Sequence, residues 1–172
     1  MRVISGTAGG RKFQAPEGDQ TRPITDRAKE GIFNMLSCYL DFEGLTVVDL
    51  FAGSGSFGIE ALSRGAETVT FVEKRPQAQQ IIQKNLDQLG LGADATILRG
   101  SVEQALGQLS HVDLAFCDPP YALDEWATLL PNVRADYVVG HAAFEIELTA
   151  GWEEVRRRKY GRSRVVIASR SK

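Results

Sequence analysis

The chain has 172 residues, of which 43% are hydrophobic and 24% charged, a balance that fits one domain with a full hydrophobic core and excludes a disordered or collagen-like protein. Its longest apolar stretches, such as residues 112–117, are too short to cross a bilayer, and the N-terminus lacks the apolar region of a signal peptide, so we expect a cytoplasmic protein. The net charge of −2 hides basic ends around an acidic middle: residues 1–40 carry a net +2, residues 41–150 a net −10 and residues 151–172 a net +6.

The first 40 residues predict a small extension in front of the main domain. Residues 2–5 and 11–14 predict a short hairpin, and a loop follows it. A helix is expected from Thr25 to Leu40, because apolar residues recur there at helical spacing.

From residue 45 onward, the pattern alternates between strands and helices. Short apolar runs predict strands over residues 45–49, 68–73, 95–99, 112–117 and 143–147. Helices are expected over residues 56–64, 75–89 and 101–109, and a closing antiparallel hairpin over residues 152–159 and 164–169. This alternation predicts an α/β fold, a doubly wound, Rossmann-like and mostly parallel sheet with helices on both faces.

A glycine-rich loop joins the first strand to its helix. Residues 53–58 match the pattern Gly-x-Gly-x-x-Gly, and Glu73 ends the second strand 20 residues after Gly53. Such glycines let a ligand approach the backbone at a helix N-terminus, and a carboxylate at Glu73 can accept hydrogen bonds from ribose hydroxyls. The pattern admits a nicotinamide-dependent oxidoreductase or a methyltransferase that binds S-adenosylmethionine. Asp49 favours the methyltransferase, because its carboxylate would attract the cationic end of that cofactor and repel a pyrophosphate.

The tetrapeptide Asp118-Pro119-Pro120-Tyr121 directly follows the fourth predicted strand. Its prolines remove two backbone donors and leave carbonyl oxygens, a carboxylate and an aromatic ring. The exocyclic amino group of a base is a double donor and a poor nucleophile. Asp118 and the Pro119 carbonyl can accept both of its N–H bonds, while Tyr121 stacks on the flipped base. The alternative is that the tetrapeptide is only a rigid turn by which the chain leaves the strand.

The two motifs together resemble the class I methyltransferases that methylate amino groups of bases. Further segments are similar to the bacterial 16S ribosomal RNA guanine-N2 methyltransferases of the RsmD type. These segments are Arg22-Pro23-Ile24-Thr25-Asp26-Arg27, Arg2-Val3-Ile4-Ser5-Gly6, residues 49–55 and Glu60-Ala61-Leu62-Ser63-Arg64-Gly65. The resemblance covers nearly the whole chain. It implies a class I methyltransferase sheet with an antiparallel C-terminal strand in residues 41–172, and a hairpin and helix in residues 1–40 that form a lid for RNA and cofactor.

The resemblance also implies the activity and the cofactor site. The protein would transfer a methyl group from S-adenosyl-L-methionine to the N2 atom of a guanine in 16S ribosomal RNA within a small-subunit particle, as a monomer and without a metal or a membrane. The candidate cofactor-binding residues are Thr25, Asp26, Asp49, Phe51, Ala52, Gly53, Ser54, Gly55, Glu73, Lys74, Ser101 and Val102. Ser101 departs from the family, which often has Asp or Asn there to bind adenine, so adenine recognition would depend on the backbone near Val102.

Basic side chains near both ends are the candidate partners of RNA phosphates. They are Arg11, Lys12, Arg22, Arg27, Arg156, Arg157, Arg158 and Lys159. The alternative for residues 156–159 is that they form only a charged face in contact with solvent. His111 and His141 are expected to be structural or surface residues, Trp126 and Trp152 to pack in the interior, and Cys38 and Cys117 to be reduced thiols.

Three other functions compete with this interpretation. An adenine-N6 methyltransferase of DNA or RNA would share the Asp118 tetrapeptide, but only 62 residues separate Gly55 from Asp118, which leaves no room for a DNA target-recognition domain. A non-catalytic RNA-binding assembly factor would not need Asp49, Glu73 and Asp118 together. A nicotinamide oxidoreductase has no evident use for the Asp118 tetrapeptide.

Overall fold

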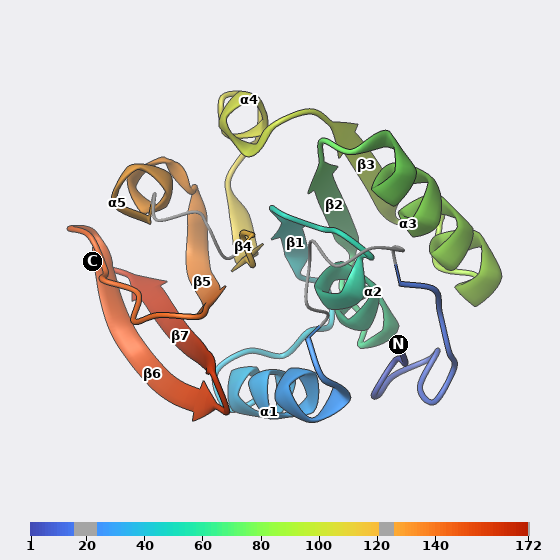
Figure 1. Ribbon diagram of the computed structural model, residues 1–172, viewed down its shortest axis with the longest axis horizontal. Helices are drawn as coiled ribbons and strands as arrows, with labels where there is room; N and C mark the ends of the chain where they lie inside the picture. Colours follow the sequence, from blue (N-terminus) through green and yellow to red (C-terminus); the bar gives the residue numbers. More distant parts are fainter. Residues whose placement is uncertain (16–23, 121–125, 172) are drawn as a thin grey trace.

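The computed structural model describes residues 1–15, 24–120 and 126–171, and its centre is one seven-stranded sheet (Figure 1). The strand order is β3-β2-β1-β4-β5-β7-β6. The strands from β3 to β5 in this order are parallel to one another, whereas β7 runs antiparallel to both β5 and β6. The strand bounds are β1 Thr46–Asp49, β2 Thr68–Glu73, β3 Ala95–Arg99, β4 Val112–Cys117, β5 Ala135–Ala142, β6 Trp152–Tyr160 and β7 Ser163–Arg170. The predicted fold class is therefore confirmed.

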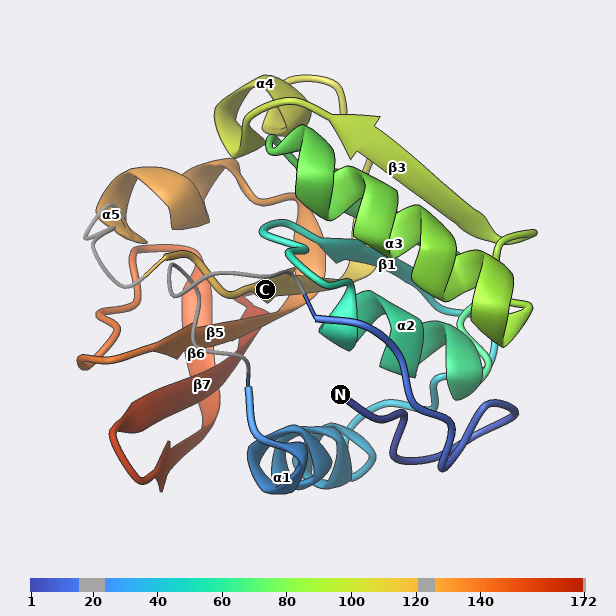
Figure 2. The same cartoon turned by 45° about the vertical axis from the view of Figure 1, so that its right-hand side comes forward.

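Helices cover both faces of the sheet, as the turned view in Figure 2 shows. Their bounds are α1 Asp26–Leu36, α2 Ser56–Ser63, α3 Pro76–Leu89, α4 Val102–Leu106 and α5 Trp126–Leu129, with a 3₁₀ turn at Leu130–Asn132. One core cluster joins α1, α2 and α3 to the sheet, and a second joins α4 and α5 to its other face. In the first cluster the rings of Phe57 from α2 and Phe116 from β4 stack at 4.8 Å. No helix in the described part of the chain is both long and apolar enough to span a membrane.

Most predicted elements lie where the sequence indicates. The strands expected over residues 68–73, 95–99 and 112–117 have those bounds. Helix α1 is shorter than the expected stretch from Thr25 to Leu40, for reasons visible at both ends. Thr25 is its N-cap and accepts a hydrogen bond from the Ala28 N–H, while the Ser37 hydroxyl at its C-cap donates back to the Phe33 carbonyl.

The prediction of the fifth strand was wrong. Residues 143–147 are not a strand, and β5 lies just before them at Ala135–Ala142. This strand runs between β4 and β7 and is buried along most of its length, so it lacks the alternation of a half-exposed strand. Gly140 interrupts its apolar run because an added Cβ would lie 2.8 Å from the side chain of Ile146. Ile146, which lies within the predicted stretch, thus packs against β5.

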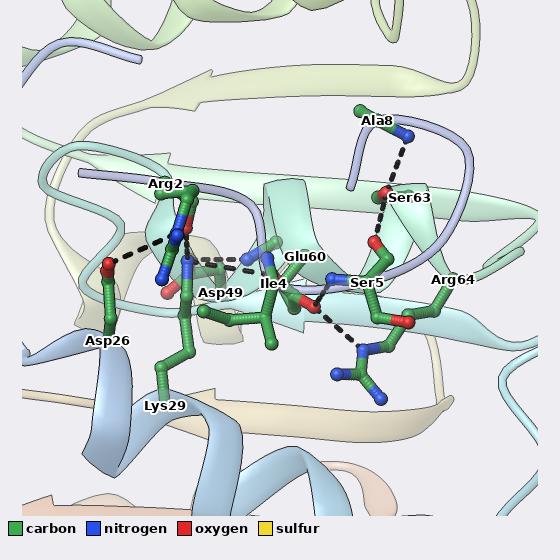
Figure 3. Close-up of polar contacts among 11 residues, drawn as sticks. Arg2, Ile4, Ser5, Ala8, Asp26, Lys29, Asp49, Glu60, Ser63 and Arg64 are labelled. Carbon is green, nitrogen blue, oxygen red and sulfur yellow. Dashed lines mark hydrogen bonds and ion pairs between the residues drawn. The ribbon is translucent and has the colours of Figure 1, made fainter. Parts of the chain in front are cut away.

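The N-terminal residues are tied to the helices by a buried charge cluster (Figure 3). Glu60 of α2 is 0% exposed, and its two carboxylate oxygens accept hydrogen bonds from the backbone N–H groups of Ile4 and Ser5 at 2.7 and 3.0 Å. Lys29 of α1 lies 3.6 Å from the same carboxylate, and Arg64 lies 2.8 Å from it. Burial lowers the pKa of Lys29, and the nearby Glu60 carboxylate opposes that shift. The hairpin itself is reduced to a single antiparallel bridge between residues 2 and 12.

Candidate functional site

Three carboxylates meet at one edge of the sheet, where parallel strands end. Asp49 is the last residue of β1, Glu73 is the last residue of β2, and Asp118 directly follows β4. Because β1 pairs with both β2 and β4, these ends are neighbours. Burial raises the pKa of Asp49, and the charges of the Asp118 and Glu73 carboxylates raise it further. The carboxylates that the sequence places at strand ends therefore lie at one site.

Asp49 has the most unusual environment of the three carboxylates. Its side chain is 1% exposed, and its Oδ2 atom accepts a hydrogen bond from the Gly58 N–H at 3.1 Å. Its Oδ1 atom has no hydrogen-bond partner among the described residues. Burial is the main reason that the pKa of Asp49 rises from 3.8 to about 7. A buried carboxylate oxygen without a partner is suited to a ligand that brings a cation or an N–H donor.

The two glycines at the start of the loop have different surroundings. Gly53 has a φ of 57°, and a Cβ built on it would approach only the Phe51 carbonyl oxygen, at 3.8 Å. Gly55, with a φ of 81°, is the N-cap of α2, and a Cβ there would press on Ile59 at 3.1 Å. Ser56 follows it, and its buried hydroxyl has no partner in the described ranges. Gly53 therefore leaves open space for a ligand, whereas Gly55 serves the turn and the packing.

Glu73 is bonded to this loop. One carboxylate oxygen accepts the Gly53 N–H at 2.9 Å, and the other accepts the Arg75 N–H at 2.8 Å. The Arg75 guanidinium also lies 3.2 Å from the second oxygen. Each carboxylate oxygen has two acceptor sites, so the oxygen bonded to Gly53 retains capacity for a hydroxyl donor.

Asn85 of α3 is a loop-supporting residue that the sequence analysis missed. It is 0% exposed, and its amide donates to the carbonyls of Ser54 and Gln14 at 3.1 and 2.9 Å. Its Oδ1 atom accepts the Gln14 N–H at 2.9 Å. The glycine loop and the N-terminal segment are thus held by one side chain. A lone Asn on a helix gives no sequence signal for such a role.

The predicted adenine end of the cofactor site lies at the start of α4. The Ser101 hydroxyl accepts the Gln104 N–H at 3.3 Å, and the Gln104 side chain accepts the Ser101 N–H at 3.2 Å. This reciprocal capping box, together with a hydrogen bond that lowers the pKa of Glu103, engages the Ser101 hydroxyl within the protein. Val102 is buried beside it.

The remaining predicted cofactor residues lie in two places, beside the glycine loop and β2 or at the start of α1. Ala52 and Ser54 are buried, Phe51 is partly buried and Lys74 is exposed. Thr25, the cap of α1, is exposed, and Asp26 is paired with Arg2 at 3.5 Å.

The segment after β4 places Asp118 beside a histidine. The Asp118 side chain is 30% exposed, and its Oδ1 atom lies 2.7 Å from Nδ1 of His141 in β5. Pro119 is buried and Pro120 is exposed, while Tyr121 lies outside the residues that the structure describes. Cys117 is buried, and burial raises the pKa of its thiol far above the usual range, which excludes it as a nucleophile. Within the described ranges, no group of three or more His, Cys, Asp or Glu side chains could hold a metal ion.

The basic side chains differ in how far they are already paired. Arg11 donates to the Leu89 and Gln88 carbonyls at the C-terminal end of α3. Arg157 lies 2.9 Å from each of the carboxylates of Glu145 and Glu154. Arg22 lies outside the described residues. The other candidates are exposed: Lys12, Arg27, Arg156, Arg158 and Lys159.

Comparison with known proteins gives a consistent result. The family model described as Conserved hypothetical protein 95 matches residues 1–169. A Bacillus subtilis protein provisionally named as the rRNA methyltransferase YlbH is 45% identical over 134 residues, which span 76% of this chain and 72% of that protein. Ribosomal RNA small subunit methyltransferase D of Haemophilus influenzae is 38% identical over 70% of this chain and 64% of its own length. A solved Escherichia coli structure, provisionally named as the methyltransferase yhhF, superposes with a TM-score of 0.86 and 28% identity over 99% of this chain and 98% of that one.

Proposed function

This chain belongs to the family described as Conserved hypothetical protein 95, and we propose that it transfers a methyl group from S-adenosyl-L-methionine to the N2 amino group of a guanine in 16S ribosomal RNA. One observation carries the proposal: buried Asp49, with an oxygen that has no partner among the described residues, lies at the end of the strand next to the one that Asp118 follows. The first carboxylate suits a cationic cofactor, and the second suits an amino group that donates hydrogen bonds. The names of the relatives support small-subunit ribosomal RNA as the source of that amino group.

The residues around the glycine loop fit this cofactor. When bound, S-adenosylmethionine supplies an electrophilic methyl group on a sulfonium. Asp49 Oδ1 would accept a hydrogen bond from its ammonium group, which gives the buried carboxylate its missing partner. Glu73 would accept hydrogen bonds from the ribose hydroxyls, and the open side of Gly53 would let the backbone approach.

Asp118 prepares the nucleophile. Its carboxylate accepts an N–H bond of the guanine amino group, and the Pro119 carbonyl accepts the other, so that the nitrogen lone pair is directed at the methyl group. Positive charge develops on nitrogen as the new bond forms, and the adjacent carboxylate stabilises it. The proton that nitrogen loses after methylation passes to Asp118 or to water. Tyr121 stacks on the base in this proposal.

The N-terminal residues and the basic side chains present the RNA. Residues 1–40 form the lid and residues 41–172 the methyltransferase domain, an arrangement supported by the contact of Asn85 with both Gln14 and Ser54. The exposed basic residues of β6 bind phosphates. The protein acts as a monomer in the cytoplasm, on RNA within a small-subunit particle.

A methyl-transfer assay with a base readout tests this function. Small-subunit particles and free 16S RNA are incubated with the protein and labelled S-adenosylmethionine, and the RNA is digested to nucleosides. We expect N2-methylguanosine, and we expect Asp118→Ala to lower turnover by about 100-fold or more, the scale of losing one preorganised polar contact. Cofactor affinity of this variant, measured by calorimetry, should remain unchanged. N6-methyladenosine as the product would refute the guanine assignment, and full activity of Asp118→Ala would refute the mechanism.

A further inference from the structure

We infer that His141 is a positioning residue for methyl transfer: its Nδ1–H holds the Asp118 carboxylate so that the second oxygen, Oδ2, faces the amino group of the base. This inference rests on the proposed function, because it assigns a role in presenting the amino group to Asp118. It concerns a residue that the sequence analysis expected to be structural or exposed.

The sheet itself brings the two side chains together. In the parallel pair of β4 and β5, Cys117 is opposite Gly140, so Asp118 and His141 occupy the next position along both strands. Asp118 Oδ1 and His141 Nδ1 are 2.7 Å apart, within the range of a charge-assisted hydrogen bond. On its other side, His141 pairs with Val165 of β7. The imidazole is therefore supported by a strand with hydrogen-bonded neighbours on both sides.

Charge and burial decide where the proton lies. An ionised Asp118 can only accept hydrogen bonds, so the proton of the shared bond belongs to His141 Nδ1. The His141 side chain is 5% exposed, and its Nε2 atom has no partner among the described residues. A lone pair at that buried nitrogen costs less than an unpaired N–H of a charged imidazolium. The geometry therefore favours a proton on Nδ1, in the bond shared with Asp118.

With the proton on Nδ1, the imidazole donates its hydrogen bond to Asp118. A buried histidine that served only packing would be expected to have its polar atoms paired within the core. Here the one polar contact of the ring with a described residue is with the carboxylate proposed to accept the substrate amino group. Asp118 is 30% exposed, so without the hydrogen bond from His141 its side chain could rotate toward the solvent. Small displacements of a positioning group are costly for the reaction rate.

Three substitutions test whether the effect of His141 comes from its hydrogen-bond donor or from the volume of its ring. In His141→Asn, the amide nitrogen can take the place of Nδ1 and donate to Asp118, whereas in His141→Gln it reaches toward the place of Nε2. His141→Ala removes the donor altogether. We expect kcat to fall by about 10-fold or more in the Ala and Gln variants, the scale of one charge-assisted hydrogen bond, with the KM for S-adenosylmethionine unchanged. The Asn variant should recover most of the lost kcat.

A double-mutant cycle shows whether His141 acts through Asp118. In the Asp118→Ala background, His141→Ala should cause no further loss of kcat. Independent effects of the two substitutions would overturn the inference, as would equal activity of the wild-type protein and His141→Ala. Failure of the wild-type protein to methylate guanine would instead refute the proposed function.

A measurement on the wild-type protein avoids any problem with folding of the variants. Nitrogen NMR of ¹⁵N-labelled histidine reports which ring nitrogen carries the proton. We expect the Nδ1–H form for His141 at neutral pH. The Nε2–H form would overturn the inference without any activity assay.

Discussion

Replacing Asp49 by Asn should stabilise the cofactor-free protein at neutral and alkaline pH. The pKa of Asp49 is about 7 in the folded protein and 3.8 in its ordinary environment, because burial disfavours the charged carboxylate. Between these two values the unfolded chain has lost a proton that the folded protein retains, so the stability of the fold decreases as pH rises from 3.8 to about 7. With 1.36 kcal/mol for each pH unit, the loss at pH 8 is about 4 kcal/mol, an upper estimate for a single buried group. Asn carries no charge at any pH and avoids this loss.

Urea unfolding of both proteins at pH 4 and pH 8, without cofactor, measures the effect. The other carboxylates titrate in both proteins, so the difference between them isolates Asp49. We expect nearly equal stabilities at pH 4 and a more stable Asp49→Asn variant at pH 8. Saturating S-adenosylmethionine should stabilise the wild-type protein at pH 8 and have much less effect on the variant, since a charge-assisted hydrogen bond worth about 1.5–3 kcal/mol is lost. A variant no more stable than the wild-type protein at pH 8, or a difference that does not grow with pH, would refute the reasoning.

Two further predictions concern the cofactor and the RNA. Glu73→Ala should weaken S-adenosylmethionine binding by about 1.5–3 kcal/mol in calorimetric titration, because it removes both the proposed ribose acceptor and the carboxylate that holds the Gly53 N–H. Unchanged affinity would remove Glu73 from the cofactor site. Arg156→Ala and Arg158→Ala should each lower the salt dependence of RNA binding, with a decrease in slope of about 0.7 to 0.9 per arginine. Arg157→Ala is the matched control on the same strand, because this side chain is paired with Glu145 and Glu154, and an equal effect of all three substitutions would contradict the assignment.

The sequence predicts where candidate side chains lie best when they stand at the ends of strands. Asp49, Glu73 and Asp118 each end or follow an apolar run, and a parallel sheet brings such ends to one edge whatever the details of packing.

Contacts that depend on the neighbours of a strand could not be predicted in this way. His141 reaches Asp118 only because β5 lies next to β4 and Gly140 is opposite Cys117. The sequence points to residues 143–147 for this strand, because a strand buried on both faces lacks a period of two. Nothing local in the sequence shows which polar residue in such a strand faces a neighbouring carboxylate. Placing β5 a few residues too late therefore also hid the partner of Asp118.

A carboxylate at Asp49 destabilises the empty fold and suits a cationic cofactor for one physical reason. Burial is the main cause of the raised pKa of Asp49, and the charges of Asp118 and Glu73 add to it, so the three carboxylates of the proposed site oppose one another before any ligand binds. Within the described ranges, the Asp49 carboxylate accepts a hydrogen bond only from the Gly58 N–H, and its Oδ1 atom has no partner. A neutral side chain would remove the electrostatic penalty, but it would also remove the attraction for a cationic cofactor. The penalty in the empty site and the affinity of the occupied site therefore have the same physical origin, which is a buried negative charge that the protein alone does not neutralise.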